Sequence, residues 1–159
     1  MSNFHECGCP GSQIIDRREE DGSDAPSDSV PSELKQWPIQ MHLVSPGAPY
    51  FKNADIVISA DCVAYALGNF HGKYLRGKSL AIACPKLDDG QDVYAEKIKA
   101  LIDESKANTI TVLIMQVPCC GGLLRLVKEA AAGASRKIPI KAITVSLQGE
   151  ILSEDWVAA

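Results

Sequence analysis

The sequence predicts a three-layer, doubly wound α/β fold with a mainly parallel sheet of four to five strands. Short, nearly continuous apolar runs alternate along the chain with longer segments whose apolar residues recur at helical spacing. Continuous apolar runs are typical of parallel strands, because helices cover both faces of such a sheet. The strand–helix alternation implies right-handed crossovers between neighbouring strands.

Five segments are predicted to be strands. The first contains Pro38, which has no amide hydrogen to donate and therefore favours an edge position. The other four are rich in aliphatic and β-branched residues, as buried strands are. The predicted strands are 37–44, 55–61, 79–84, 109–117 and 140–147.

Amphipathic helices are predicted between these strands. In the clearest one, apolar residues recur at i, i+4, i+7 and i+8 from Tyr94, and charged residues occupy the opposite face. Asp61, Asp88 and Asp89 precede predicted helices and are candidate N-terminal caps. The predicted helices cover 91–106, 122–132 and, with a weaker pattern, 62–70.

The composition changes sharply in the segment 16–33, where acidic residues dominate and apolar residues are almost absent. Such a segment cannot bury enough apolar surface to offset the entropy lost on ordering, so we expect a flexible linker. It divides the chain into a cysteine-bearing N-terminal segment (1–15), the acidic linker (16–33) and an α/β domain (34–159). We expect the N-terminal segment to fold back over the carboxyl edge of the sheet.

Overall composition excludes several classes of protein. The 159 residues carry a net charge of −4 with scattered basic residues, which gives no reason to expect a nucleic-acid partner. No apolar run reaches the about 18 residues that a membrane span needs, so no membrane association is expected. The N-terminus has no signal-peptide pattern, and we therefore expect a cytoplasmic, reducing location in which structural disulfides do not form.

Cysteines follow three of the predicted strands. Cys62 comes directly after 55–61, Cys84 ends 79–84, and the pair Cys119–Cys120 follows 109–117. The carboxyl ends of parallel strands meet at one edge, which is where open α/β sheets bind ligands. Free cysteines also fill space as small apolar residues, but packing alone gives no reason to choose this edge three times. A shared site is therefore predicted.

The residues around these cysteines fit a ligand site. Gly121 and Gly122 open the helix after Cys120 and would let the backbone approach a ligand closely. The start of a helix presents free N–H groups and a partial positive charge, which lowers the pKa of a thiol. Pro85 and Pro118 stiffen the two cysteine-bearing turns.

Three or four thiolates in a reducing compartment suit either zinc or an iron–sulfur cluster. Zinc ligands usually come in pairs spaced C-x₂₋₄-C, whereas these cysteines are far apart in the sequence. The C-x-C of Cys7 and Cys9 is too tight for a standard zinc knuckle. The spacing therefore favours a 4Fe–4S cluster, with zinc as the alternative.

Several motifs together resemble the C-terminal region of ferredoxin-like iron–sulfur proteins of anaerobic microbes. In that family the region usually follows a two-cluster ferredoxin module, which this sequence lacks. The resemblance implies a cluster-binding protein of anaerobic redox metabolism that transfers electrons with a separate ferredoxin or another redox partner. The motifs are "GCPGS" (8–12), "ELKQWPIQMHLVSPGAPYF" (33–51), "ADCVAYALGNFH" (60–71), "ACPKLDD" (83–89) and "VPCCGGLLRLVKEA" (117–130).

The resemblance also implies the cluster ligands. Cys7 is an extra cysteine in this comparison, and His5 is an alternative ligand near it. Within the adjacent pair the first cysteine is favoured, because it comes first off the strand. The implied ligand set is Cys9, Cys62, Cys84, Cys119 and Cys120.

Three functions remain open at this stage. The first is electron transfer by a fully ligated cluster. The second is an enzyme in which three cysteines hold the cluster and an open iron site takes part in sulfur removal or transfer. The third is a structural zinc module that binds a partner. A small molecule bound at the cluster would have His71 and Lys86 as candidate contacts.

Overall fold

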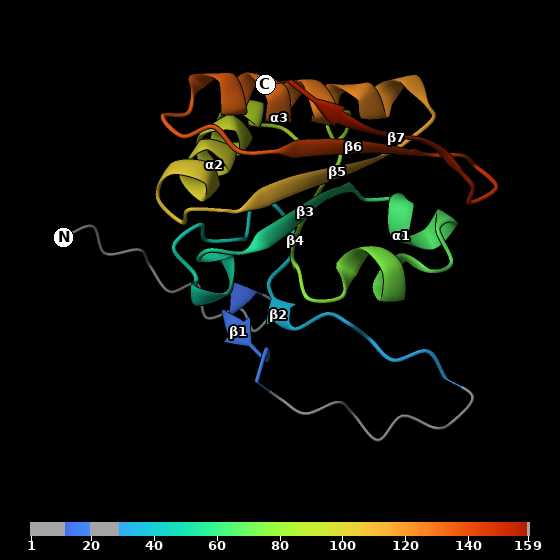
Figure 1. Cartoon of the computed structure of the whole chain (residues 1–159), viewed down its shortest axis with the longest axis horizontal. Helices are drawn as coiled ribbons and strands as arrows, with labels where there is room; N and C mark the ends of the chain where they lie inside the picture. The colour runs from blue at the N-terminus through green and yellow to red at the C-terminus, as the bar shows by residue number, and fades with distance from the viewer. Residues whose placement is uncertain (1–11, 20–28, 159) are drawn as a thin grey trace.

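A five-stranded sheet forms the centre of the computed structural model, which describes residues 12–19 and 29–158. The strand order is β4-β3-β5-β6-β7, in which the first four strands are parallel neighbours and β7 runs antiparallel to β6 (Figure 1). This confirms the predicted fold class. The strands are β3 (Asp55–Ala60), β4 (Ser79–Ala83), β5 (Thr109–Met115), β6 (Ile140–Val145) and β7 (Ile151–Val157).

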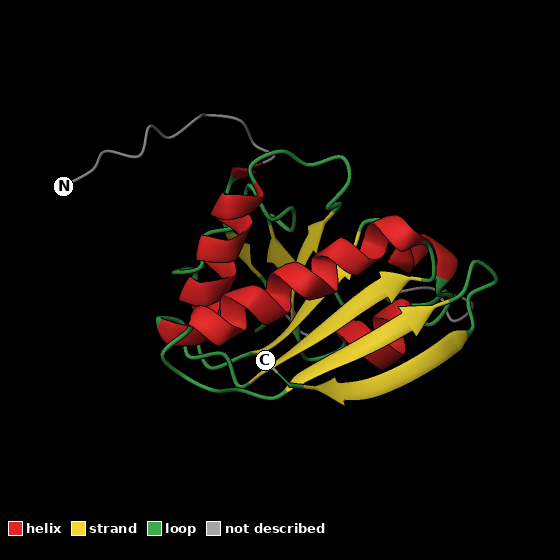
Figure 2. Ribbon diagram, turned by 90° about the horizontal axis from the view of Figure 1, so that it is seen from above, coloured by secondary structure: helices red, strands yellow, loops and turns green. Residues whose placement is uncertain are grey.

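Helices cover both faces of the sheet. Figure 2 shows α2 (Gln91–Asp103) and α3 (Gly121–Gly133) in front of the strands, with the short helices of the β3–β4 connection behind them. That connection contains α1 (Val63–Ala66) and a π-helical segment, η3 (Phe70–Leu75). The predicted helix 62–70 is therefore wrong beyond Ala66, where the chain turns at Leu67 before η3 begins.

The core lies on both sides of the two central strands. All residues of β3 from Ile56 onward and all residues of β5 from Ile110 onward are buried. The four predicted strands that belong to this sheet each end one or two residues earlier than expected at the carboxyl end. The loops that follow therefore begin at Asp61, Cys84 and Gln116.

The N-terminal part forms a small separate ladder. β1 (Ile15–Asp16) pairs antiparallel with β2 (Gln36–Trp37), and η2 (Pro49–Phe51) follows. The predicted strand 37–44 is wrong, because Pro38 has no amide hydrogen to continue the ladder and the chain turns after Gln40. The predicted linker begins inside β1, while Cys7, Cys9 and His5 lie outside the described residues.

This N-terminal part covers the free edge of β4. The side-chain amide of Gln36 donates to the carbonyl of Leu80 at 2.8 Å and accepts from the amide of Leu80 at 2.7 Å. The amide of Ile82 donates to the carbonyl of Ile39 at 2.8 Å, and Met41 donates to the carbonyl of Ile82 at 2.9 Å. Segment 36–41 therefore satisfies backbone groups that an edge strand leaves unpaired.

The opposite edge is formed by β7, which the sequence analysis missed. Five of its seven residues are exposed, so the segment lacks the apolar run that marked the other strands. Lys141 on β6 supports it with an ion pair to Glu154 at 2.9 Å and a contact with the ring of Trp156 at 4.8 Å.

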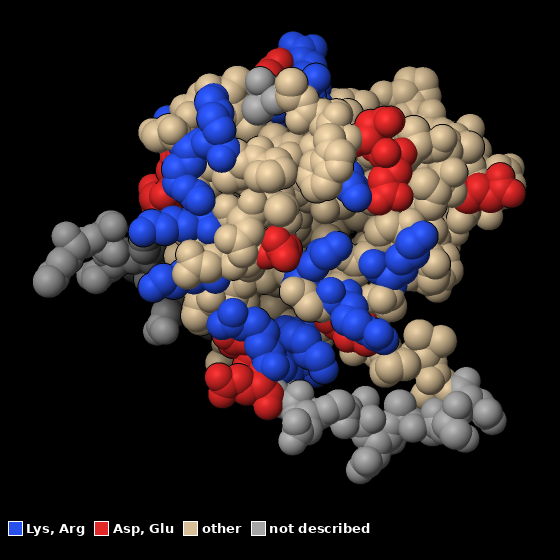
Figure 3. All heavy atoms as spheres, in the orientation of Figure 1, with Lys and Arg blue, Asp and Glu red and all other residues tan. Residues whose placement is uncertain are grey.

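Charges of both signs are distributed over the surface. On the face shown in Figure 3, lysine and arginine side chains gather over the lower part, near β1, with acidic side chains among them. Across residues 12–19 and 29–158, no helix is long and apolar enough to cross a membrane.

Candidate functional site

The predicted cysteines of the described chain lie on three neighbouring loops. Cys62 is the N-cap residue of α1 and is separated from β3 by Asp61 alone, and Cys84 directly follows β4. Cys119 and Cys120 lie in the short helix η4 (Pro118–Cys120), between β5 and α3. Because β4, β3 and β5 are adjacent and parallel, the three loops meet at one edge of the sheet.

The chain diverges at this edge. After β3 it passes to the face that carries α1, whereas after β4 and β5 it passes to the face that carries α2 and α3. Such a switch point opens a crevice outside the carboxyl ends of the strands, and doubly wound proteins bind their ligands there. Cys62 therefore begins the connection on one face of the sheet, and Cys84 and Cys119 belong to connections on the other face.

The four thiols differ in exposure. Cys62 and Cys119 are exposed, Cys84 is half-buried and Cys120 is buried. Burial raises the pKa of the Cys120 thiol, a backbone hydrogen bond at Met115 lowers it, and the neighbouring thiols of Cys119 and Cys62 raise it again. At Cys120 burial therefore outweighs the lowering that was expected from the start of the helix.

The loop after Cys84 packs against the start of α3. A side-chain carbon placed on Gly122 would lie 3.4 Å from Cβ of Pro85. Gly122 thus allows the two cysteine-bearing loops to approach each other, whereas the sequence analysis expected it to face a ligand. Gly121 has open space at the same position, with no atom within 4 Å.

Asp88 holds the Cys84 loop in place. Its Oδ2 accepts hydrogen bonds from the backbone amide of Cys84 at 2.9 Å, the hydroxyl of Tyr94 at 2.5 Å and the side-chain amide of Gln40 at 3.1 Å. The expected capping role is wrong, because the N-cap of α2 is Gly90 and no side chain caps it. Because Asp88 also fits a helix-capping pattern, its role in holding the Cys84 loop could not be recognised from the sequence.

Tyr94 is the residue from which the hydrogen bonds to Asp88 could have been predicted. It is fully buried on the inner face of α2, and a buried tyrosine hydroxyl needs a hydrogen-bond partner. Burial and the hydrogen bond to Asp88 raise the pKa of Tyr94, so the hydroxyl stays protonated and donates. A search for an acceptor near this position would have pointed to Asp88.

Asp61 occupies an unusual position beside Cys62. Its Oδ1 is buried and has no hydrogen-bond partner among the described residues, and the cap of α1 is Cys62 instead. Burial raises the pKa of Asp61, and the charge of Asp88 raises it further. Asp61 and His71 line a pocket of about 320 Å³ under α1. Lys86 is exposed in the Cys84 loop and is not part of this pocket.

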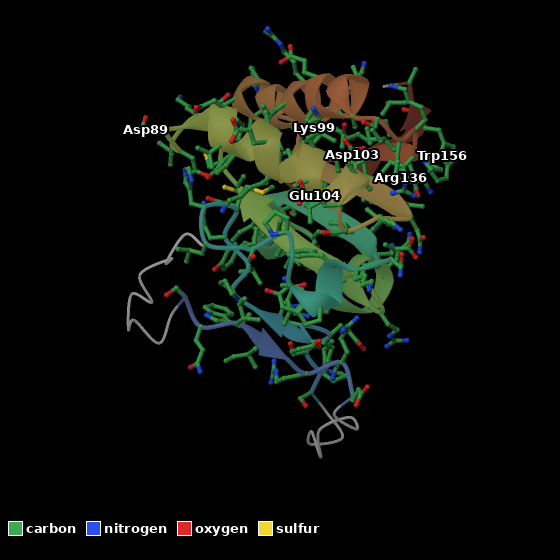
Figure 4. The ribbon with its side chains drawn as sticks, turned by 90° about the vertical axis from the view of Figure 1, so that its left-hand side faces the viewer. Asp89, Lys99, Asp103, Glu104, Arg136 and Trp156 are labelled. Carbon is green, nitrogen blue, oxygen red and sulfur yellow. The ribbon has the colours of Figure 1, made fainter. Side chains whose placement is uncertain are left out.

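Across the described ranges, no group of three His, Cys, Asp or Glu side chains is placed to hold one metal ion. In Figure 4 sulfur atoms gather on the side of Asp89, while Lys99, Asp103, Glu104, Arg136 and Trp156 lie toward the opposite end of the molecule.

Comparisons with known proteins place the chain in a family. The profile of a family described as a Rossmann-like domain matches residues 48–158, a range that includes Cys62, Cys84, Cys119 and Cys120. A protein of Archaeoglobus fulgidus, described as an uncharacterized protein, is 33% identical over 119 residues, which cover 75% of this chain and 83% of that protein. No solved structure matches the chain. The chain therefore belongs to this family of Rossmann-like domains.

Proposed function

We propose that the carboxyl edge of the sheet binds a 4Fe–4S cluster and that the protein works in anaerobic redox metabolism. The observation that supports this proposal is the placement of cysteines on three neighbouring loops around the switch point. Cys62, Cys84 and Cys119 would supply three ligands, and Cys9 of the N-terminal segment would supply a fourth. When bound, the cluster would supply one-electron redox chemistry.

Exposure favours Cys119 over Cys120 as the ligand from η4. A ligand must be a thiolate, and the buried Cys120 has a raised pKa that disfavours this form. Cys119, in contrast, is exposed. Cys120 would then act as a buried packing residue.

The surrounding chain would hold the ligands in position. Asp88 fixes the backbone of Cys84 through its 2.9 Å hydrogen bond, and Gly122 lets that loop rest on α3. Outer hydrogen bonds of this kind orient metal ligands and tune reduction potentials. The exposed side of the crevice would leave the cluster accessible to a separate ferredoxin or another redox partner in a reducing cytoplasm.

The pocket beside Cys62 favours a second candidate, a cluster-dependent enzyme. Asp61, which lines the pocket, directly precedes Cys62, so a small molecule held there would lie next to the cysteine edge. In such an enzyme three cysteines would hold the cluster and leave one iron open for sulfur removal or transfer. A structural zinc module is the third possibility, and metal analysis separates it from both.

The test is metal and sulfide analysis of anaerobically purified protein, with visible absorption and electron paramagnetic resonance. About four iron and four sulfide per chain are expected for the proposed cluster. Colourless protein with one zinc per chain would replace the proposal by the zinc module.

Single variants assign the ligands. Cys62→Ala, Cys84→Ala and Cys119→Ala should lower iron content or change the spectra, and Cys120→Ala is the matched control expected to keep both. Cys9→Ala should leave a three-cysteine cluster with altered spectra, and Cys7→Ala should have no effect. Full iron content in Cys62→Ala would mean that Cys62 is not a cluster ligand and would contradict the proposed site at this edge of the sheet. Addition of small thiols, cyanide or sulfide to the reduced protein then separates the first two functions, since only an open iron changes its resonance.

A further inference from the structure

The pocket under α1 lies where three parts of the chain meet. It has a volume of about 320 Å³, at the lower end of the range for small-molecule sites and roughly twice the volume of an engineered cavity that binds benzene. A ligand of the size of a substituted six-membered ring would therefore fit. The apolar walls are Leu34 and Ile39 from the N-terminal part, Phe70 and Leu75 from η3, and Leu80 and Ile82 from β4.

Two polar contacts hold the N-terminal wall of the pocket against η3 and the turn after it. The backbone amide of Glu33 donates to Nδ1 of His71 at 3.1 Å, and Nε of Arg76 forms an ion pair with Oε1 of Glu33 at 3.0 Å. Leu34 directly follows Glu33 and is therefore held at the pocket. Specific contacts between distant segments thus define the shape of the pocket.

His71 has one ring nitrogen left for a ligand. Nδ1 accepts the amide of Glu33 and so carries no proton, which places the proton of the neutral ring on Nε2. Nε2 has no acceptor among the described residues. The buried side-chain nitrogen and oxygen atoms that lack a partner in this part of the chain are Asp61 Oδ1 and Tyr74 Oη, so Nε2 of His71 is not buried and solvent reaches it.

The other polar groups of the pocket offer a ligand little. Ser59 donates its hydroxyl to the carbonyl of Ala60 at 3.0 Å. Asp61 also lines the pocket, but its Oδ1 has less than 1 Å² of accessible surface and is closed to a ligand. Tyr65 lines the pocket although it is 94% exposed, so its ring lies at the rim and can cover an apolar ligand. The Nε2–H group of His71 is therefore the donor that a ligand can use.

We propose that this pocket binds a small uncharged ring compound with a hydrogen-bond acceptor, such as a ketone, whose oxygen accepts from Nε2–H of His71. The apolar walls provide most of the contact area, and the single donor fixes the orientation of the ligand. No lysine or arginine lines the pocket, so an anion would lose its hydration without a partner. An ammonium group is itself a donor and cannot use the donor of His71. The site goes beyond the proposed cluster and uses none of the cysteines.

The test compares cyclohexanone with methylenecyclohexane, in which a CH₂ group replaces the oxygen, by NMR of the full chain at pH 8. Both compounds should shift the amide resonances of pocket residues, because both fill the same apolar volume. Spectra of the imidazole nitrogens should show the His71 proton on Nε2, and the ketone alone should shift these resonances. A proton on Nδ1, an unmoved Nε2 resonance with the ketone bound, or binding of neither compound would overturn the proposal.

His71→Phe keeps an aromatic ring and removes the donor. The affinity for cyclohexanone, divided by that for methylenecyclohexane, should fall about three- to tenfold, as expected for one neutral hydrogen bond. The hydrocarbon reports whether the pocket is intact, and an unchanged ratio would refute the role of His71. If the variant binds neither compound, the imidazole resonances of the wild type decide. The matched control is His42→Phe, at a histidine outside the pocket, which should leave both affinities unchanged.

Two further measurements fix the place of binding. Ala64→Trp fills the pocket from its wall and should block both compounds, and binding of either one to this variant would place it elsewhere and contradict the proposal. Protein stripped of metal with a chelator should bind cyclohexanone as the untreated protein does, and loss of binding would contradict independence from the cysteine edge. Iron content, measured separately, decides the cluster proposal whatever the result of these titrations.

Discussion

Replacement of Asp88 tests how the Cys84 loop is held. Asp88→Ala removes the acceptor of three hydrogen bonds, whose donors are the backbone amide of Cys84, the hydroxyl of Tyr94 and the side chain of Gln40. Gln40 keeps a partner, because its amide also donates to the Tyr94 oxygen at 3.0 Å. Two partly buried donors are therefore left without an acceptor.

The magnitude follows from these two donors. Each unsatisfied buried donor costs about 1–3 kcal/mol, so the free energy of unfolding should fall by about 2–6 kcal/mol. Relief of the repulsion between Asp88 and Asp61 opposes this loss, so we expect a net decrease of about 3 kcal/mol. Asp88→Asn keeps an oxygen acceptor and removes only the charge, and we expect a cost of about 1 kcal/mol.

Urea denaturation followed by fluorescence of the two tryptophans measures the change. For a domain of this size the alanine variant should lower the melting temperature by roughly 5–10 °C. Carboxyl NMR supplies the second measurement: the pKa of Asp61 should fall toward its ordinary value in both variants, because both remove the Asp88 charge. Asp88→Asn is expected to remain well folded, so a change in packing without the loss of the Asp88 charge would not alter the pKa of Asp61 in this variant.

Two results would refute the reasoning. A loss below about 0.5 kcal/mol in Asp88→Ala would mean that water satisfies the released donors as well as the carboxylate does. Equal losses in the alanine and asparagine variants would mean that charge, and not the acceptor geometry, holds the loop.

Three further predictions concern the same fold. The raised pKa of Asp61 means that this residue favours the native state only while its carboxyl is protonated, so its contribution to the free energy of unfolding falls as pH rises from 3.8 through that pKa. In urea titrations Asp61→Asn should therefore become more stable relative to wild type as the pH rises. A stability difference that does not change with pH would exclude this burial effect. In metal-free protein, iodoacetamide should label the exposed Cys119 before the buried Cys120, as peptide mass spectrometry would show; the reverse order would contradict the assigned exposure. Gly149→Ala should lower the free energy of unfolding by at least about 1–2 kcal/mol, because Gly149 has a φ of +83° and the new carbon would meet the carbonyl oxygen of Ala66. The control Gly133→Ala, in a helix, should leave the stability unchanged or raise it, and thermal melts measure both variants.

The parallel part of the sheet could be predicted because strands buried on both faces have continuous apolar runs in the sequence. β3 and β5 are apolar at nearly every position, and each helix between the strands has its own periodicity. β7 leaves no such mark, since it pairs on one side only and exposes Leu152 and Trp156. Its place in the sheet depends on the turn at Gly149 and on contacts with β6, which no short window of sequence contains.

The candidate site likewise has features that could be predicted from the sequence and features that could not. Chain order and parallel topology suffice to bring the cysteine-bearing loops to one edge, so their placement followed from the sequence. The difference between Cys119 and Cys120 depends on how η4 packs, and adjacent residues of one type carry no local sign of it. The missing partner of Asp61 depends on side chains from several segments, so only the folded structure reveals it.

The cover on β4 has a consequence for shorter forms of this domain. The family match begins at residue 48, yet segment 36–41 lies before it and supplies the hydrogen bonds at the free edge of β4. A chain trimmed to the matched region would lose the core residues Met41 and Val44 and would expose the amide and carbonyl groups of Leu80 and Ile82. Exposed strand edges recruit strands from other molecules, so such a fragment should self-associate and aggregate although its own sheet is intact.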